Sequence, residues 1–312
     1  MSRRILITGA AGYLGSLLGN RLAQDYFVMG TDIRARDDLT FSIEIMDIRD
    51  PAIADLIKKN QITHVVHLAS VLESKGDRAL EYDIDVNGTR NLLQACVEAG
   101  VRHLTVTSSG AAYGYHADNP EWIDEDQPLR GNREFPYADH KRQIETLLEE
   151  CRQQNPSMQQ LIFRPGTILG AQTRNLITNL FSAKRLIAIR GSESPFVFIW
   201  DRDVVSAMAQ GIECDATGIF NMAGDGAVGI YELASLLGKP VIAWPAWLLQ
   251  TVLWLGKRLG VGRYGPEQIN FLRYRPVLSN RRLKNVFGYR PEKSSRETFL
   301  YWLDHARKRG DL

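Results

Sequence analysis

The chain has 312 residues, of which 44% are apolar and 24% charged, as expected for a globular protein with a large core. Its formal net charge is +2 and its basic residues are scattered, which argues against nucleic acid as a partner. Cys96, Cys151 and Cys214 lie far apart, without a C-x-x-C pair. This pattern argues against disulfides and bound metal and fits a reducing compartment, so we expect a cytoplasmic protein.

Strand and helix patterns alternate from the beginning of the chain. Short apolar runs that end in turns predict buried strands, at residues 4–7, 26–32, 63–68, 103–107 and 160–163. Apolar residues at helical spacing predict helices between them, at residues 14–22, 87–98 and 135–151. Strands that alternate with helices form a parallel sheet covered on both faces, so we expect a doubly wound α/β fold.

The turn after the first predicted strand is rich in glycine, since residues 8–15 read T-G-A-A-G-Y-L-G. Glycines let the backbone turn tightly and approach a pyrophosphate, and the N-terminus of the following helix offers free N–H groups to its charge. A glycine string alone is weak evidence. This one follows a strand and opens a helix, which is the context that a dinucleotide-binding turn requires.

Asp32 stands at the end of the second predicted strand, where a carboxylate accepts hydrogen bonds from both ribose hydroxyls and repels a 2′-phosphate. Arg34 and Arg36 complicate this assignment, because arginines nearby can accommodate that phosphate. We weigh Asp32 more heavily because it occupies the specified position. The sequence therefore predicts NAD rather than NADP as the cofactor.

Tyr137 and Lys141 are four residues apart and share one face of a predicted helix. A nearby ammonium and a cationic nicotinamide ring favour the phenolate, so such a tyrosine can transfer protons at neutral pH. The spacing alone also occurs by chance, but this pair follows a strand that ends in Ser108 and Ser109. Ligands bind at the carboxyl ends of parallel strands, so we expect both serines to face the cofactor crevice.

The alternation changes after residues 164–166, where helices and loops mix with short strands such as residues 218–221. We find no internal repeat and no low-complexity linker. We therefore expect an NAD-binding domain at residues 1–170 and a smaller, mixed α/β substrate domain at residues 171–312. Segments near residues 203–230 are expected to return to the first domain.

Residues 241–256 form an apolar stretch with three tryptophans. The stretch is shorter than the ~20 residues of a membrane-spanning helix and contains Pro245, so we expect no integral membrane span. We expect a buried or lid helix that begins after Pro245. An apolar substrate wall or a membrane-surface helix is the alternative, because Lys257 and Arg258 follow directly.

In their order and spacing these motifs resemble the extended short-chain dehydrogenase/reductase superfamily, also called the NAD-dependent epimerase/dehydratase family, over most of the chain. The matching segments are the turn at 8–15, Asp32, Asp47-Ile48, H-L-A-S at 67–70, D-V-N-G-T at 85–89, S-S-G-A-A-Y-G at 108–114, Tyr137-x-x-x-Lys141, R-P-G at 164–166 and F-G-Y-R-P at 287–291. The resemblance implies a Rossmann domain that binds NAD. It also implies a homodimer formed by the helices around residues 85–99 and 137–151.

The resemblance also implies roles for individual residues. Tyr137 would be the general acid/base, Lys141 would bind the nicotinamide ribose and lower the pKa of Tyr137, and Ser109 would hold the reacting oxygen, with Ser108 as the alternative donor. Asn87 would support a proton-relay water, or merely tie backbone segments together. Asp47 would contact the adenine, or would only cap the following loop. The resemblance implies that these residues contact NAD: Gly9, Gly12, Tyr13, Leu14, Gly15, Asp32, Ile33, Asp47, Ile48, Leu68, Ala69, Ser70, Asn87, Thr107, Tyr137, Lys141 and Pro165.

Two classes of small-molecule substrate stay open. Nucleotide-sugar epimerases and dehydratases of this family usually carry an R-D-x-I-H-V-x-D segment, and the corresponding stretch here has Phe196 at the arginine position and Trp200 at the histidine position. Losing a guanidinium at a diphosphate is not a neutral change. The arginines that could compensate for this loss are Arg273, Arg275, Arg281 and Arg282.

The second class is a less polar secondary alcohol or ketone, which would exchange a hydride with NAD. The apolar residues 244–249 resemble the corresponding part of hydroxysteroid-dehydrogenase-like relatives and would line its pocket. The sequence favours this class over the nucleotide sugars because of the missing arginine. A non-catalytic NAD-sensing protein is a third hypothesis, against which the intact Ser109, Tyr137 and Lys141 argue.

Overall fold

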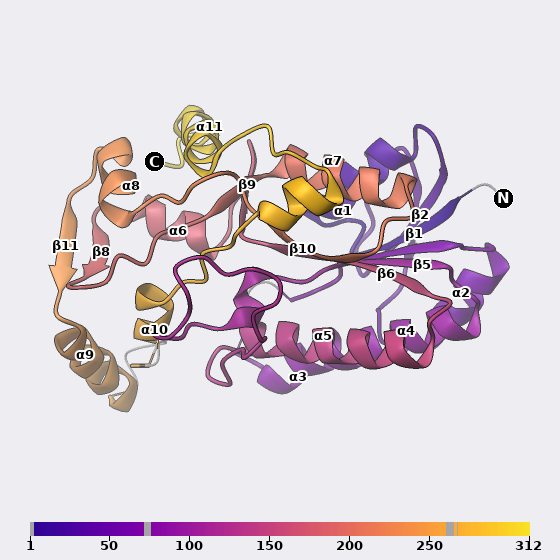
Figure 1. The fold of residues 1–312 in the computed structure, drawn as a ribbon, viewed down its shortest axis with the longest axis horizontal. Coiled ribbons are helices and arrows are strands. Elements are labelled where there is room, and N and C mark those ends of the chain that lie inside the picture. Colours follow the sequence, from indigo (N-terminus) through magenta and orange to yellow (C-terminus); the bar gives the residue numbers. More distant parts are fainter. Residues whose placement is uncertain (1–2, 72–75, 260–264, 267) are drawn as a thin grey trace.

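A seven-stranded sheet organises the larger part of the molecule (Figure 1). The computed structural model describes residues 3–71, 76–259, 265–266 and 268–312, and within them all neighbouring strands of this sheet pair in parallel. The strands, in the spatial order β10-β6-β5-β4-β1-β2-β3, are β10 (Gly218–Met222), β6 (Gln159–Pro165), β5 (His103–Thr107), β4 (His64–His67), β1 (Arg4–Thr8), β2 (Phe27–Asp32) and β3 (Ser42–Ile45).

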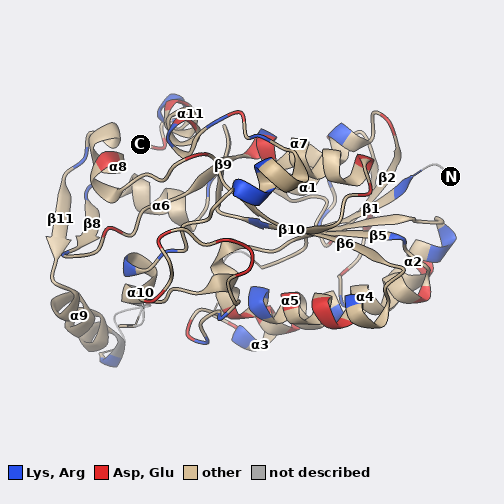
Figure 2. Cartoon of the chain, in the orientation of Figure 1, with Lys and Arg blue, Asp and Glu red and all other residues tan. Residues whose placement is uncertain are grey.

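Helices cover both faces of this sheet because alternate strand residues point to opposite sides (Figure 1). Ile5 and Ile7 of β1 join the core under α1 and α7, whereas Leu6 joins the core under α2, α4 and α5. Acidic and basic residues are mixed along α4 and α5 (Figure 2). The helices of this part are α1 (Tyr13–Leu22), α2 (Ile53–Lys59), α3 (Arg78–Tyr82), α4 (Gly88–Glu98), α5 (Pro136–Gln154) and α7 (Asp201–Glu213).

A smaller region with its own core lies beside the carboxyl ends of the strands (Figure 1). Aromatic side chains dominate this core, including Phe181, Phe198, Phe299 and Trp302. Two short parallel pairs, β7 with β9 and β8 with β11, complete it. The elements are β7 (Thr167–Leu169), α6 (Leu176–Ser182), β8 (Leu186–Ile189), β9 (Phe198–Trp200), α8 (Ile230–Leu237), β11 (Val241–Trp244), α9 (Ala246–Arg258), α10 (Gln268–Arg273) and α11 (Ser295–Lys308).

The doubly wound α/β fold expected from the sequence is confirmed, and each strand expected in residues 4–163 is present. Within residues 4–163, the segments that the pattern did not predict are β3, α2 and α3. The helix expected from residue 87 begins at Gly88, because a π-helical turn occupies Asp83–Asn87.

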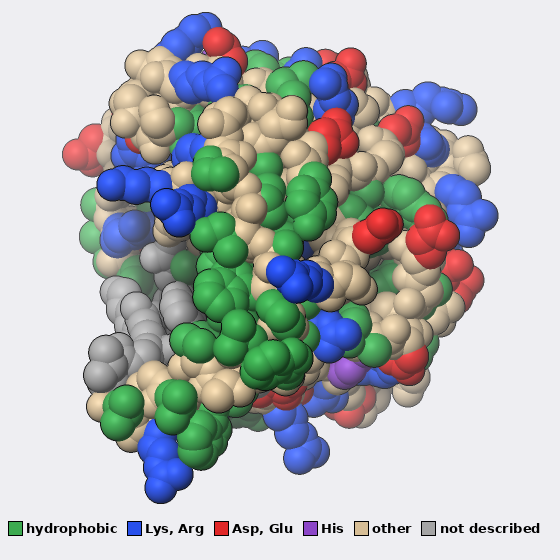
Figure 3. Space-filling model, turned by 90° about the vertical axis from the view of Figure 1, so that its left-hand side faces the viewer, with side chains coloured by type: hydrophobic (Ala, Val, Ile, Leu, Met, Phe, Trp, Pro, Cys, Tyr) green, Lys and Arg blue, Asp and Glu red, His purple; other side chains and the backbone are tan. Residues whose placement is uncertain are grey.

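The helix expected after Pro245 is also present, as α9, but the expectation that it is buried is wrong. It belongs to a largely apolar area on one face of the molecule (Figure 3). Among the described residues, no helix is both long enough and apolar enough to cross a membrane.

Candidate active site

The glycine-rich turn joins β1 to α1 at the carboxyl edge of the sheet. Gly9 has a φ of +70°, and a Cβ there would lie 2.7 Å from the backbone nitrogen of Ala69. A Cβ at Gly15 would lie 2.8 Å from the Cα of Ala10, and still closer to the carbonyl oxygen of Gly9. These neighbours are backbone atoms that cannot move aside, so the turn requires both glycines. The first amides of α1 lack partners within the helix, and the turn therefore fits a pyrophosphate.

Asp32 ends β2 and lies beside this turn. Its carboxylate accepts hydrogen bonds from the backbone nitrogens of Ala11, at 3.0 Å, and Arg34, at 3.1 Å. The Arg36 guanidinium pairs with Asp38 through two nitrogens, which leaves it little freedom to hold a phosphate. This arrangement favours a cofactor with a free 2′-hydroxyl.

Tyr137 and Lys141 lie in the first turns of α5, which begins with Pro136. The Lys141 Nζ donates to the carbonyl oxygen of Thr107 at 3.2 Å and lies 5.6 Å from the centre of the Tyr137 ring. Lys141 is buried, yet it forms no ion pair among the described residues. The ammonium is thus held at the end of β5, beside the tyrosine.

The two serines after β5 do not share one environment. Ser108 is buried and its hydroxyl donates to Glu145 of α5, so it is already engaged. Ser109 caps the following 3-10 turn by accepting from the Ala111 nitrogen, which leaves its hydroxyl proton free to donate. The expectation that both serines face the crevice is therefore corrected, and Ser109 is the one available donor of the pair.

Asn87 ends a π-helical turn, and its side chain bonds to neighbouring helical residues. Its amide donates to Asp83 and accepts from Arg90. Asp85 points inward instead and accepts from Ser70, from the Val71 nitrogen and from His140.

Asp85 is a member of the site that sequence reasoning missed. Burial opposes ionisation of Asp85, but the hydrogen bonds from His140 and Val71 and the nearby Lys141 ammonium hold its pKa below the ordinary value. We therefore expect a carboxylate beside Lys141. The signal that could have found it is its place within D-V-N-G-T, two residues before Asn87.

The expected adenine contacts lie after β3. Asp47 forms a two-pronged ion pair with Arg49, which in turn pairs with Asp83, so its carboxylate has a partner in this structure. The Arg49 guanidinium lowers the pKa of Asp47. Ile48 is buried, and Asn91 donates to its carbonyl oxygen.

The remaining residues expected to contact NAD lie along the carboxyl edges of the strands. Thr107 ends β5 and Pro165 ends β6. The segment of Leu68, Ala69 and Ser70 follows β4 and bonds back to Thr8 through the nitrogens of its first two residues. Three further expected residues lie near the glycine-rich turn: Tyr13, whose hydroxyl donates to Asp201, Leu14 in α1, and the exposed Ile33 after β2.

His67 binds neighbouring hydroxyls instead of a ligand. Its Nδ1 lies 2.8 Å from the Thr8 hydroxyl and its Nε2 lies 2.9 Å from the Thr89 hydroxyl. Burial lowers the pKa of His67 to about 3, with the Lys141 ammonium acting in the same direction. We infer a neutral imidazole that ties β1 and β4 to α4. Over the described part of the chain, no cluster of His, Cys, Asp and Glu has the arrangement of a metal site.

Arg275 is the arginine that lies beside Phe196. Its guanidinium carbon is 3.9 Å from the centre of that ring and 5.2 Å from the ring of Phe271. Among the described residues it donates only to neutral acceptors, the carbonyl and hydroxyl oxygens of Ser194 and the carbonyl of Leu272, and its buried Nε has no partner there. Burial lowers the pKa of Arg275 to about 10, so it stays charged at neutral pH.

Tyr115 is near both this arginine and Tyr137. Its ring packs edge-on against Phe135 and Phe271. Burial raises the pKa of Tyr115 above its ordinary value, Tyr137 adds to the rise and Arg275 opposes it. Tyr115 is therefore close enough to interact electrostatically with both residues.

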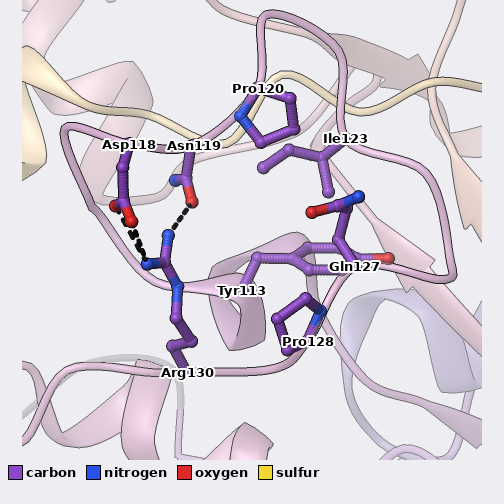
Figure 4. Close-up of a pocket in the computed structure, with 8 residues that line it drawn as sticks. All are labelled: Tyr113, Asp118, Asn119, Pro120, Ile123, Gln127, Pro128 and Arg130. Atoms are coloured by element: carbon purple, nitrogen blue, oxygen red, sulfur yellow. Dashed lines mark hydrogen bonds and ion pairs between the residues drawn. The ribbon is translucent and has the colours of Figure 1, made fainter.

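A cavity of about 170 Å³ lies in the loop that follows Tyr113 (Figure 4). Asp118 and Asn119 accept hydrogen bonds from Arg130 at its rim, and Ile123 and Gln127 face its interior. None of the residues expected to hold NAD lines it. The cavity therefore lies outside the candidate site.

Taken together, the parallel sheet, the glycine-rich turn and the Tyr137–Lys141 pair at its carboxyl edge define an extended short-chain dehydrogenase/reductase. Residues 5–223 match the model of the NAD dependent epimerase/dehydratase family. The chain belongs to this family, and it is an NAD-dependent enzyme.

Individual relatives agree with this assignment. An uncharacterized protein of Mycobacterium tuberculosis is 25% identical over 324 aligned residues, which cover 98% of this chain and 84% of that protein. N-acetyl-alpha-D-glucosaminyl-diphospho-ditrans,octacis-undecaprenol 4-epimerase of Escherichia coli O157:H7 is 31% identical over 181 residues, 58% of this chain and 53% of that one. The solved UDP-glucose 4-epimerase of Thermus thermophilus in complex with NAD shares the fold, with a TM-score of 0.75, 23% identity and coverage of 97% and 99%.

Gly15→Ala tests the glycine-rich turn. The added Cβ would meet the backbone of Gly9 and Ala10, so we expect the affinity for NAD to fall about tenfold or more, which corresponds to about 1.4 kcal/mol. Calorimetric titration of NAD into protein that has been unfolded, stripped of any bound nucleotide and refolded measures this. Gly229→Ala is the matched control, because Gly229 has a φ of −72° and open space around its Cβ position. An unchanged NAD affinity in Gly15→Ala would remove the turn from the cofactor site.

Proposed function

We propose that this enzyme is an epimerase whose substrate is a sugar joined to its carrier through a diphosphate. The observation that carries the proposal is Arg275, which is charged, largely desolvated and without a carboxylate partner among the described residues. A buried cation without a counter-ion is costly, and a guanidinium binds phosphate oxygens strongly. The anion that would complete this site is a substrate diphosphate.

Arg275 also removes the main argument for a less polar substrate. The sequence favours an alcohol or ketone because Phe196 stands where relatives carry an arginine. Since the Arg275 guanidinium lies directly over the Phe196 ring, the charge is supplied from another segment at the same place. Two relatives reported above are named as sugar 4-epimerases, one for a UDP-sugar and one for a sugar on undecaprenyl diphosphate. The diphosphate is common to both substrates.

The residues of this chain can then be given roles. We assign the pyrophosphate of NAD to the turn of Gly9, Gly12 and Gly15, and its adenosine ribose to Asp32. Bound there, NAD supplies reversible hydride acceptance at a carbinol carbon of the sugar. We assign Tyr137 to the proton of the sugar hydroxyl.

Two further residues would support Tyr137. Lys141 stabilises the phenolate of Tyr137 and contacts the nicotinamide ribose. Ser109 donates to the reacting oxygen.

We further propose a cytoplasmic enzyme with an NAD-binding domain at residues 1–170 and a substrate domain at residues 171–312. All three cysteines are free, which supports a reducing compartment. Because β10 belongs to the central sheet and α7 packs on it, their positions support the return of residues near 203–230 to the first domain.

Retention of the cofactor tests the epimerase proposal. An epimerase ends each turnover in its starting redox state, so it has no need to release NAD. We expect close to one NAD per chain to survive extensive dialysis of the purified protein. Acid denaturation followed by absorbance and mass measurement of the supernatant provides the count. A protein that is empty and then binds NAD reversibly would instead favour a dehydrogenase, and released NADP would contradict the role of Asp32.

Arg275→Gln tests the diphosphate site. We expect the KM for UDP-glucose to rise about tenfold to hundredfold, because a charge-assisted hydrogen bond contributes about 1.5–3 kcal/mol. Tyr137→Phe should lower kcat instead and leave KM nearly unchanged. Arg281→Gln, at an exposed arginine, is the control. Assaying a polyprenyl-diphosphate sugar in parallel, and comparing its KM with that of UDP-glucose, shows which of the two carriers the enzyme uses. An unchanged KM for both sugars in Arg275→Gln, or turnover of a neutral ketone alone, would overturn the proposal.

We also propose a homodimer in which α4 and α5 of the two chains pack together, as the family resemblance implies. Val97 of α4 is 39% exposed and would be covered in it. Light scattering should give about twice 35.2 kDa for the parent, and a lower mass for Val97→Arg. Val286→Arg, at an exposed valine outside these helices, should leave the mass unchanged. A parent that is monomeric at all concentrations would contradict this interface.

A further inference from the structure

The helix α9 lies largely at the surface of the molecule. Eight of its thirteen residues are apolar, yet none of its side chains that the structure describes is buried. The helices α4, α5 and α7, by contrast, each bury several side chains. Because a helix of this length is marginal in water without tertiary packing, and α9 packs only in part against its neighbours, its exposed apolar side is open to a further partner.

The exposed apolar side chains of α9 lie on one side of the helix. Trp247, Trp254 and Leu255 are seven and eight positions apart, which is two helical turns, and they are 66%, 48% and 45% exposed. Leu259 continues this row beyond the last turn. Figure 3 shows a continuous apolar area that reaches the lower edge of this face.

Basic residues accompany this area. The strand pair β8–β11 lies next to α9 along the chain, because β11 leads directly into this helix. In the pair, Ile187 is opposite Ile242 and Ile189 is opposite Trp244. The backbone nitrogen of Arg190 donates to the Trp244 carbonyl. The Arg258 guanidinium lies 5.3 Å from the Trp254 ring. Residues 176–192 and 239–259 contain no acidic residue, and their six basic residues are Lys184, Arg185, Arg190, Lys239, Lys257 and Arg258.

We propose that this area, which we call the α9 surface (residues 184–190 and 241–259), binds the surface of a membrane that contains anionic phospholipids. Exposed tryptophans and leucines next to lysines and arginines are the composition of a helix that lies in the membrane interface. A second copy of the chain is a poorer partner. A symmetric contact would bring two identical basic surfaces together without acidic residues to neutralise them.

The α9 surface is connected to the candidate substrate site through α10. Helix α10 packs against α9, and it also supports Arg275, which donates to the Leu272 carbonyl and packs against Phe271. Membrane binding would therefore hold the anchor for an anionic substrate close to the lipid. This consequence rests on the proposed function, whereas lipid binding itself does not.

Vesicle sedimentation with the full-length protein tests the proposal. We expect the protein to bind vesicles of about 70% phosphatidylcholine and 30% phosphatidylglycerol, because the anionic lipid attracts the basic residues. Binding to pure phosphatidylcholine should be at least about tenfold weaker. Binding should also weaken in about 0.5 M salt, because part of the attraction is electrostatic.

Two pairs of variants separate the contributions to binding. The double variant Trp247→Ser/Trp254→Ser should lose about tenfold or more in affinity for the mixed vesicles, and Val286→Ser, at another exposed apolar residue, should change it less than about twofold. The double variant Lys184→Glu/Arg185→Glu should lose a similar factor in affinity for the mixed vesicles. Its control is Lys58→Glu/Lys59→Glu, which removes two adjacent exposed lysines of α2. Circular dichroism and bound NAD establish that each variant is folded.

Absence of binding to the mixed vesicles would overturn the proposal, as would equal losses in the test and control variants. A change of mass by light scattering in the tryptophan variant, without a change in vesicle binding, would make the α9 surface a protein interface and also overturn it. Turnover of water-soluble UDP-glucose is measured separately and should be retained in the tryptophan variant. Vesicle binding by a protein inactive on every diphosphate sugar would contradict only the proposed function.

Discussion

The buried ion pair between Arg164 and Glu145 fixes the geometry on which the active site depends. Arg164 of β6 reaches α5 through Glu145, and it also donates to the Tyr113 hydroxyl, which in turn donates to Asn221 of β10. Ser108 donates to the same glutamate. Removing one partner of such a pair typically costs about 3–5 kcal/mol, whereas replacing both by apolar groups is often neutral. The network therefore fixes the orientation of α5 more than it adds net stability, because it holds this helix against the ends of β5, β6 and β10.

The orientation of α5 determines which of the expected site residues come close to one another. With α5 fixed by Glu145, the first turns of the helix hold Tyr137 and Lys141 beside the Thr107 carbonyl at the end of β5. The sequence predicts this meeting well, because both the strand and the helix have strong periodic patterns and ligands of parallel sheets gather at the strand ends. It predicts the glycine-rich turn for the same reason. The short edge strand β3 was missed because most of it is exposed, so it lacks an apolar run.

The periodic pattern of the sequence predicts side-chain positions poorly where a helix is irregular or where the partner is distant in the sequence. The π-helical turn at Asp83–Asn87 adds a residue to one turn, and within it Asp85 bonds to His140 of α5 whereas Asn87 bonds to Asp83. Ser108 was expected in the crevice, but its buried partner Glu145 is far away in the sequence. Arg275 was one of four arginines without a distinguishing pattern, and only the folded chain brings it over Phe196. These residues depend on long-range contacts that no local pattern encodes.

The same long-range packing joins the surroundings of Arg275 to the exposed helix α9. Arg275 has no acidic partner among the described residues, and its surroundings are the carbonyl oxygens of Ser194 and Leu272 and two aromatic rings. A carboxylate there would neutralise the guanidinium permanently and compete with any anionic ligand. Leaving the charge unpaired costs stability, and in the proposed function this cost keeps the guanidinium available to a phosphate. Since α10 accepts a hydrogen bond from this arginine and also packs against α9, it links the outer helix to the guanidinium that we propose as the anion site.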